Sequence, residues 1–261
     1  LAEKGVELKR IEPSEPGRIE PEEVFTLVDS RTRMAALASC HYVSGYRIEI
    51  DTIGRELRSR GILFCVDGIQ TMGAFPTPVE HVDFLAADAH KWMLGPCASG
   101  VLYVKHEMQA RLKPVVQGWH NLSCPDFIAR ETLDYKPDSR RYEAGTANLL
   151  GIVGHRASLQ LLNALGLDNI ATDLLAKRRR LVPGLLAKGC DVMHAEVPEA
   201  NASGIVTFHK PDGDMTALAE QLGQAGFKVS LRVMRNGSRF IRLSPHFYNT
   251  DAELDRLLEV L

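Results

Sequence analysis

Short apolar runs alternate with amphipathic stretches through the first 105 residues, and most runs end at a turn or a polar residue. This pattern predicts buried strands separated by helices. The expected strands span residues 33–39, 62–66, 82–87 and 100–105, and the expected helices open at 21–23 and run from Asp51, as N-cap, to about Ser59. Strands separated by helices favour a mostly parallel sheet, so the predicted fold class is α/β.

The second half of the chain has a different pattern. Residues 113–148 carry Pro and Gly without periodicity, and a loop of that length is usually functional or interfacial. Helical spacing returns at 152–165 and 168–181. After residue 189 the pattern predicts strands at 204–208, 227–231 and 239–243 and helices at 215–225 and 251–260, with Asp251 as the N-cap of the last helix. We therefore predict a large domain over 1–150, connecting helices over 151–188 and a small α+β domain over 189–261.

Charge and composition exclude several classes of protein. The 261 residues carry 31 Lys+Arg against 33 Asp+Glu, a net charge of −2, which argues against a nucleic-acid partner. The basic run at 177–180 is interpreted as a solvated helix face. No apolar run approaches about 20 residues, so no membrane span is expected. The five cysteines form no CxxC pair, no leader opens the sequence, and the histidines are scattered, so we expect reduced thiols, a cytoplasmic location and no metal site.

Polar residues of unusual type follow two of the predicted strands. Asp67 and Gln70 follow the run at 62–66, while His90 and Lys91 follow the run at 82–87. Ligands of open α/β sheets bind beyond the carboxyl ends of the strands, where these side chains would converge. A Lys amine forms a Schiff base with an aldehyde, and an Asp can hold a pyridine nitrogen protonated.

An ordinary structural interpretation competes with this one. Asp67 could be a helix cap, His90 a satisfied core residue and Lys91 a surface charge. Each of these assignments is plausible alone. The four side chains together, at this spacing, favour the chemical interpretation.

Four segments resemble the class V aminotransferase family, which comprises pyridoxal-phosphate enzymes of fold type I. They are residues 64–73, 87–92, 141–148 and 242–250. The family includes cysteine desulfurases, cystine lyases and isopenicillin N epimerase-like proteins. The resemblance runs in order from about residue 5 to the end, and it implies part of the large domain of fold type I followed by the small domain.

The resemblance also implies roles for six residues. Lys91 matches the Schiff-base lysine, and Asp67 matches the partner of the pyridinium nitrogen. Gln70 matches the residue near the phenolic oxygen of the cofactor, and His90 matches the residue beside the lysine that lies near the phosphate.

The other two matches concern a second subunit and the substrate. Thr146 matches a threonine that reaches the phosphate of the neighbouring subunit, which implies a homodimer with shared active sites. Arg242 matches the arginine that binds the substrate α-carboxylate, a task that suits a bidentate guanidinium. The competing interpretation of Arg242 is a structural ion pair.

The sequence departs from the family pattern in three respects. Asp88 stands where many relatives carry Ser or Thr, and a carboxylate there would repel a phosphate unless it is turned away or paired with a cation. The stretch 229–241 is short and has no Cys, which argues against a persulfide-forming desulfurase. The main phosphate-binding loop and the ring that stacks on the cofactor are not found, so we expect this chain to be catalytically incomplete and to leave apolar surface uncovered.

These observations favour a pyridoxal-phosphate-dependent enzyme of the aminotransferase type that acts on a small amino acid. A lyase or epimerase of the same family is the alternative enzyme. A truncated domain that folds without retaining the cofactor is the alternative from another class.

Overall fold

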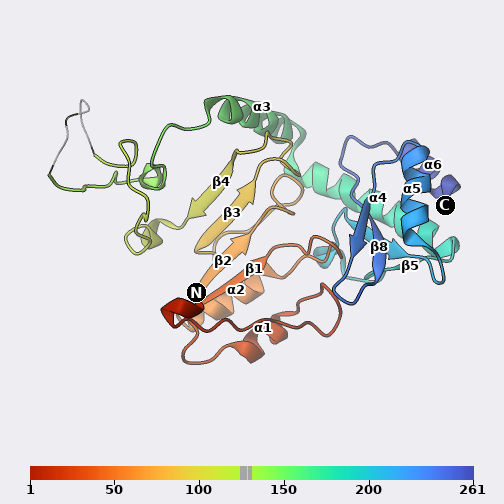
Figure 1. The fold of residues 1–261 in the computed structure, drawn as a ribbon, viewed down its shortest axis with the longest axis horizontal. Coiled ribbons are helices and arrows are strands. Elements are labelled where there is room, and N and C mark those ends of the chain that lie inside the picture. Colours follow the sequence, from red (N-terminus) through yellow and green to blue (C-terminus); the bar gives the residue numbers. More distant parts are fainter. Residues whose placement is uncertain (124–127, 129–130) are drawn as a thin grey trace.

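The computed structural model describes residues 1–123, 128 and 131–261, and these form two sheets linked by long helices (Figure 1). The larger helices and strands, in chain order, are α1 (Pro21–Leu27), β1 (Met34–Ala38), α2 (Ile50–Ser59), β2 (Leu63–Asp67), β3 (Phe84–Asp88), β4 (Gly100–Val104), α3 (Leu149–Leu165), α4 (Leu167–Ala187), β5 (Asp191–Val192), β6 (Val206–His209), α5 (Met215–Gln224), β7 (Ser230–Val233), β8 (Arg239–Leu243) and α6 (Asp251–Val260). The predicted α/β class is confirmed.

The first sheet has the strand order β1-β2-β3-β4. β1, β2 and β3 are parallel, whereas β4 runs antiparallel to β3. The reversal has a local cause, because residues 89–99 form a shorter connection than the dozen or more residues that a parallel crossover takes. The carboxyl ends of the three parallel strands and the start of β4 therefore lie at the same edge.

Only one face of this sheet is fully covered. On the covered face Phe64, Val66 and Leu85 pack with Ile53 and Leu57 of α2, and all five are at most 1% exposed. The prediction of buried strands at 33–39 and 62–66 is wrong for one side of the sheet, because alternate residues of both strands face the open side.

Apolar residues lie on the open face of the sheet. Met34 and Leu102 are 52% and 53% exposed, and Ala36 and Ala86 lie between them. Cross-strand register places all four on one face. Apolar surface was expected at sheet edges and helix faces, and here it lies on a face of the sheet.

The second sheet, of order β5-β6-β8-β7, is antiparallel throughout. Its core includes Phe208, Ile241 and Leu222, which are fully buried. The helix α4 serves both halves of the molecule, because Leu174 packs in the core next to the first sheet and Leu185 in the core of the second. The predicted boundaries at residues 150 and 188 fall close to the start of α3 and the end of α4.

Several predicted element ends differ from the structure because packing and caps override the local pattern. α4 continues past the expected end at 181 and through Pro183, since Leu185 gains full burial one turn later. The predicted strand 227–231 is displaced to Ser230–Val233, where pairing with β8 is available.

Both predicted N-caps are wrong by one or two positions. α2 begins at Ile50, so Glu49 is its N-cap and Asp51 lies in the first turn. Thr250 caps α6, and it forms a capping box in which its side chain and that of Glu253 each accept a backbone N–H.

Arg47 joins the two halves of the molecule through hydrogen bonds. Its Nε donates to the Ala202 carbonyl at 2.5 Å, Nη2 donates to the Glu199 carbonyl at 3.1 Å, and the guanidinium lies 4.1 Å from the centroid of the Phe75 ring. Asn201 Nδ2 donates back to the Arg47 carbonyl at 3.0 Å. These bonds join the segment after β1 to the segment before β6.

We expect Arg47→Ala to lower the free energy of unfolding by about 2–3 kcal/mol, because charge-assisted hydrogen bonds are lost and carbonyls are left buried. Urea denaturation followed by circular dichroism measures this change. Arg55→Ala, at an exposed position of α2, is the matched control and should change stability by less than about 0.5 kcal/mol. Equal stability of the two variants would contradict the role given to Arg47.

Candidate active site

Lys91 lies just beyond the carboxyl edge of the first sheet. Asp88 ends β3, and the chain then turns, with the Gly95 N–H donating to the Ala89 carbonyl at 2.8 Å and the Leu94 N–H to the Lys91 carbonyl at 3.0 Å. Trp92, beside the lysine, is buried. The turn thus places a half-buried Lys91 amine at the edge where β2 also ends.

The charges around Lys91 come from both halves of the molecule. Burial lowers the pKa of the Lys91 amine below its ordinary value of 10.5, and the nearby Asp67 carboxylate partly opposes this shift. The guanidinium groups of Arg242 and Arg232 lower the pKa of Lys91 further. The structure therefore brings Asp67 and Arg242 into electrostatic range of Lys91, as the sequence predicts.

Asp67 is exposed at the end of β2. Its Oδ1 accepts the backbone N–H of Ile69 at 2.9 Å, so the capping role considered from the sequence is partly realised. That bond uses one carboxylate oxygen and orients the group. The other oxygen remains able to accept from a ligand.

Gln70 is buried beside Lys91. Its Oε1 accepts the indole N–H of Trp92 at 3.0 Å. Because an indole nitrogen only donates, this bond fixes which end of the amide faces Trp92, and it leaves the amide NH₂ as a donor.

His90 is exposed, which contradicts the alternative of a satisfied core histidine. Its Nδ1 lies 2.9 Å from Asp88 Oδ1. This contact with His90 is the main cause that lowers the pKa of the Asp88 carboxyl. The carboxylate that departs from the family pattern is therefore paired within its own turn.

Arg242 reaches the site from β8. Its Nη1 donates to the Tyr42 carbonyl at 2.8 Å and its Nη2 to Ser230 Oγ at 3.4 Å. Burial, with a smaller contribution from Arg232, lowers the pKa of Arg242. No carboxylate forms an ion pair with Arg242 within the described ranges 1–123, 128 and 131–261, so the structural-ion-pair interpretation finds no support there.

Sequence reasoning missed Arg232, on β7. In the antiparallel pair, Ser230 lies opposite Arg242 and Arg232 lies opposite Phe240, so both arginines occupy one face of the sheet. The alternation of residues along the two strands could have revealed this, had the register of the hairpin been known.

Thr146 is not brought to Lys91. Its side chain is exposed in the segment before α3, and among the described residues no hydrogen bond joins it to the lysine. Two residues later, Asn148 Nδ2 donates to the Ala98 carbonyl at 3.1 Å and Oδ1 caps α3. The segment is thus anchored near the loop after Lys91, with Thr146 facing outward.

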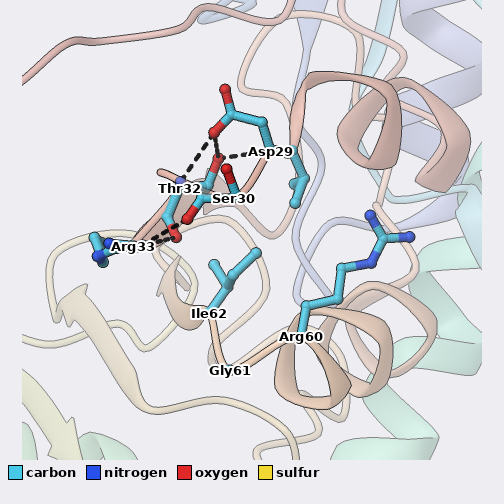
Figure 2. A pocket seen from close by; sticks show the side chains of 8 residues that line it. Asp29, Ser30, Thr32, Arg33, Arg60, Gly61 and Ile62 are labelled. Atoms are coloured by element: carbon cyan, nitrogen blue, oxygen red, sulfur yellow. Dashed lines mark hydrogen bonds between the residues drawn. The ribbon is translucent and has the colours of Figure 1, made fainter.

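A separate pocket of about 370 Å³ lies at the opposite edge of the sheet (Figure 2). Residues 28–33, before β1, and 60–62, before β2, contribute its lining. Across the part of the chain that the structure describes, no group of three or more His, Cys, Asp or Glu could hold a metal ion. No helix among those residues is long and apolar enough to span a membrane.

The lowered pKa of Lys91 should increase the reactivity of its amine towards aldehydes. Only the neutral amine attacks an aldehyde, so a lowered pKa increases the reactive fraction at a given pH. We expect the rate of covalent capture of pyridoxal by Lys91 to reach half its maximum below pH 10.5, the ordinary pKa of a lysine. Arg242→Gln, by removing a positive charge, should move that midpoint upward. A midpoint that does not respond to Arg242→Gln would contradict the electrostatic link.

The family model described as aminotransferase class-V matches residues 1–257. A "probable cysteine desulfurase" of Methanothermobacter thermautotrophicus is 26% identical over 275 residues, which cover all of this chain and 68% of that protein. The chain spans about two thirds of the length of the curated relatives that it matches.

Solved structures share the fold. The apo cysteine desulfurase from Thermococcus onnurineus NA1 matches with a TM-score of 0.89 and 24% identity, covering 99% of this chain and 66% of that one. A variant of the cystine C-S lyase C-DES, solved with glycine covalently linked to its PLP cofactor, matches with a TM-score of 0.81 and 20% identity, over 95% of this chain and 64% of that one. The predicted partial fold type I architecture is confirmed.

Proposed function

The chain belongs to the class V aminotransferase family, and we propose that it supplies the lysine-bearing part of a pyridoxal-phosphate-dependent enzyme that transforms a small amino acid by transamination. The proposal rests on the charges around Lys91, because Asp67, at the end of β2, and Arg242, on β8 of the second sheet, both act on the Lys91 amine.

The side chains at this edge fit the aldehyde and ring of pyridoxal phosphate. Lys91 offers an amine with a lowered pKa, Asp67 an oriented carboxylate, and Gln70 an amide donor. Arg242 donates one N–H of Nη1 to Tyr42 and one of Nη2 to Ser230, so each of these nitrogens keeps a second N–H for an anionic substrate group. This donor set matches a pyridine nitrogen, a phenolic oxygen and a carboxylate.

Bound there, pyridoxal phosphate supplies an electron sink for the pair released when a bond at the substrate Cα breaks. Lys91 would hold the cofactor covalently, and once the substrate amine had displaced it, the freed Nζ would be placed to take the Cα proton and return it. Asp67 would keep a proton on the ring nitrogen through a charge-assisted hydrogen bond. Arg242, braced by the Tyr42 carbonyl, orients the α-carboxylate.

A lyase or epimerase is the second candidate, because the curated relatives include proteins named cysteine desulfurase. The β7–β8 connection offers no cysteine for a persulfide route. Cys40 is buried, and burial raises the pKa of its thiol to about 12, which leaves it unreactive. Cys124 lies outside the described residues.

Thr146 supports the proposal of a homodimer with shared sites. Its exposed side chain lies next to α3, where Leu150 and Val153 are 88% and 68% exposed. An apolar helix face beside an exposed hydroxyl is suited to contact with a second subunit. We also assign the protein to the cytoplasm, in keeping with its free cysteines Cys40, Cys65, Cys97 and Cys190.

Product analysis tests the function. The protein expressed from its complete reading frame is loaded with excess pyridoxal phosphate and mixed with candidate amino acids and 2-oxo acids. Transamination should convert one amino acid and one 2-oxo acid into their counterparts in equal amounts. Release of ammonia or sulfide would favour a lyase, and loss of optical activity an epimerase. Failure to bind the cofactor would favour the inert-domain alternative and contradict the proposal.

A further inference from the structure

Arg232 and Arg242 form a pair of neighbouring cations at the site. On adjacent antiparallel strands they stand in diagonal positions of one face, where neighbouring residues lie roughly 7–8 Å apart and their Cβ atoms somewhat closer. Each also contacts the same residue of the other half of the molecule. The Tyr42 carbonyl accepts from Arg242 at 2.8 Å, and the Arg232 guanidinium lies 5.7 Å from the centroid of the Tyr42 ring.

The pair lacks counterions. Neither arginine has an ion-pair partner among the residues the structure describes, and the Nε atom of each is buried without a hydrogen-bond partner there. Of the two carboxylates that act on Lys91, Asp88 is paired with His90, and Asp67 is directed to Ile69 and the proposed ring nitrogen.

The positive charges of Arg232 and Arg242 need anions to balance them. Half-burying two guanidinium groups side by side without anions is costly, whereas anions placed between them and Lys91 would satisfy their donors. One substrate α-carboxylate can occupy one guanidinium fork. The second fork, a diagonal step away on the same face, then remains for a second acidic group.

We propose that the substrate is an amino acid with an acidic side chain, whose α-carboxylate binds Arg242 and whose side-chain acid binds Arg232. This inference rests on the proposed function and narrows its substrate class. Arg232 is then a specificity-determining residue. A neutral side chain would leave its guanidinium without an anion.

Equilibrium binding tests the assignment without turnover. Calorimetric titration of the cofactor-loaded protein with succinate should show at least about tenfold tighter binding than titration with propionate. Arg232→Gln should weaken the binding of succinate about 10–100-fold, the scale of a lost charge-assisted hydrogen-bond pair. It should weaken the binding of propionate less than about threefold. Arg232→Lys keeps the charge but not the planar guanidinium, so its affinity for succinate should lie between those of the parent protein and Arg232→Gln. Arg235→Gln, in the exposed turn after β7, is the matched control and should leave both affinities unchanged.

Three results would overturn the assignment. The first is equal affinity of the parent protein for succinate and propionate. The second is an equal loss of affinity for the two anions in Arg232→Gln. The third is a loss of affinity for pyridoxal phosphate in that variant while its preference for succinate stays intact. Thermal unfolding by circular dichroism verifies that each variant is folded, and Arg232→Lys keeps the test decisive if the glutamine variant is not. Failure of the proposed function would give a separate result, because mass spectrometry would then find no covalent cofactor on Lys91.

Discussion

Lys91→Ala is expected to abolish covalent cofactor attachment and to lower turnover at least about 1000-fold. The loss combines the covalent tether with the amine that moves the Cα proton, and proton transfer alone contributes about 10²–10⁴-fold. The side chain is half-buried and forms no hydrogen bond with the residues that the structure describes, so the fold should survive. Absorbance of the bound cofactor and steady-state turnover measure the effect.

Lys188→Ala is the control for this variant, since Lys188 is exposed at the end of α4 and far in the chain from the site. It should leave cofactor and turnover unchanged. Retention of borohydride-fixable cofactor at another residue of Lys91→Ala would show that the lysine is misassigned.

Asp67→Asn is expected to lower turnover at least about 100-fold while leaving the protein folded. Asparagine keeps an oxygen that can accept from the Ile69 N–H, so the local turn is preserved. It loses the negative charge that holds the proton on the ring nitrogen, which is comparable in scale to removing a strong electrostatic stabiliser. The same change removes the charge that raises the pKa of Lys91, so that pKa should fall further.

Two measurements examine the Asp67 prediction together. Turnover reports the cofactor electronics, and the pH dependence of pyridoxal capture reports the pKa of Lys91. Asp51→Asn, on the exposed surface of α2, is the matched control. Near-normal turnover of Asp67→Asn would contradict the role of the carboxylate.

The strand-end part of the site could be predicted from sequence because it depends on local pattern. Apolar runs that end at Asp67 and Asp88 place the next residues at the carboxyl edge in any parallel α/β sheet. Lys91 follows by three positions, within the same turn. The structure then adds what the pattern lacks, namely the His90–Asp88 contact and the Gln70–Trp92 bond.

The parts that could not be predicted depend on long-range geometry. Arg232 enters the site through the register of the β7–β8 hairpin and the docking of Tyr42, which the sequence does not specify. Uncovered apolar surface was expected, but its location on one face of the first sheet was not predicted, for the same reason. An apolar run such as 33–39 is compatible with one or two covered faces, and only the packing of α2 on a single side decides between them.

The most direct test of the central claim locates the cofactor in the chain. The protein is loaded with pyridoxal phosphate, reduced with borohydride and digested, and the modified peptide is sequenced by mass spectrometry. We expect a single adduct on Lys91, at about one per chain, that is lost in Lys91→Ala. An adduct on another lysine, or one spread over several exposed lysines in both proteins, would contradict it.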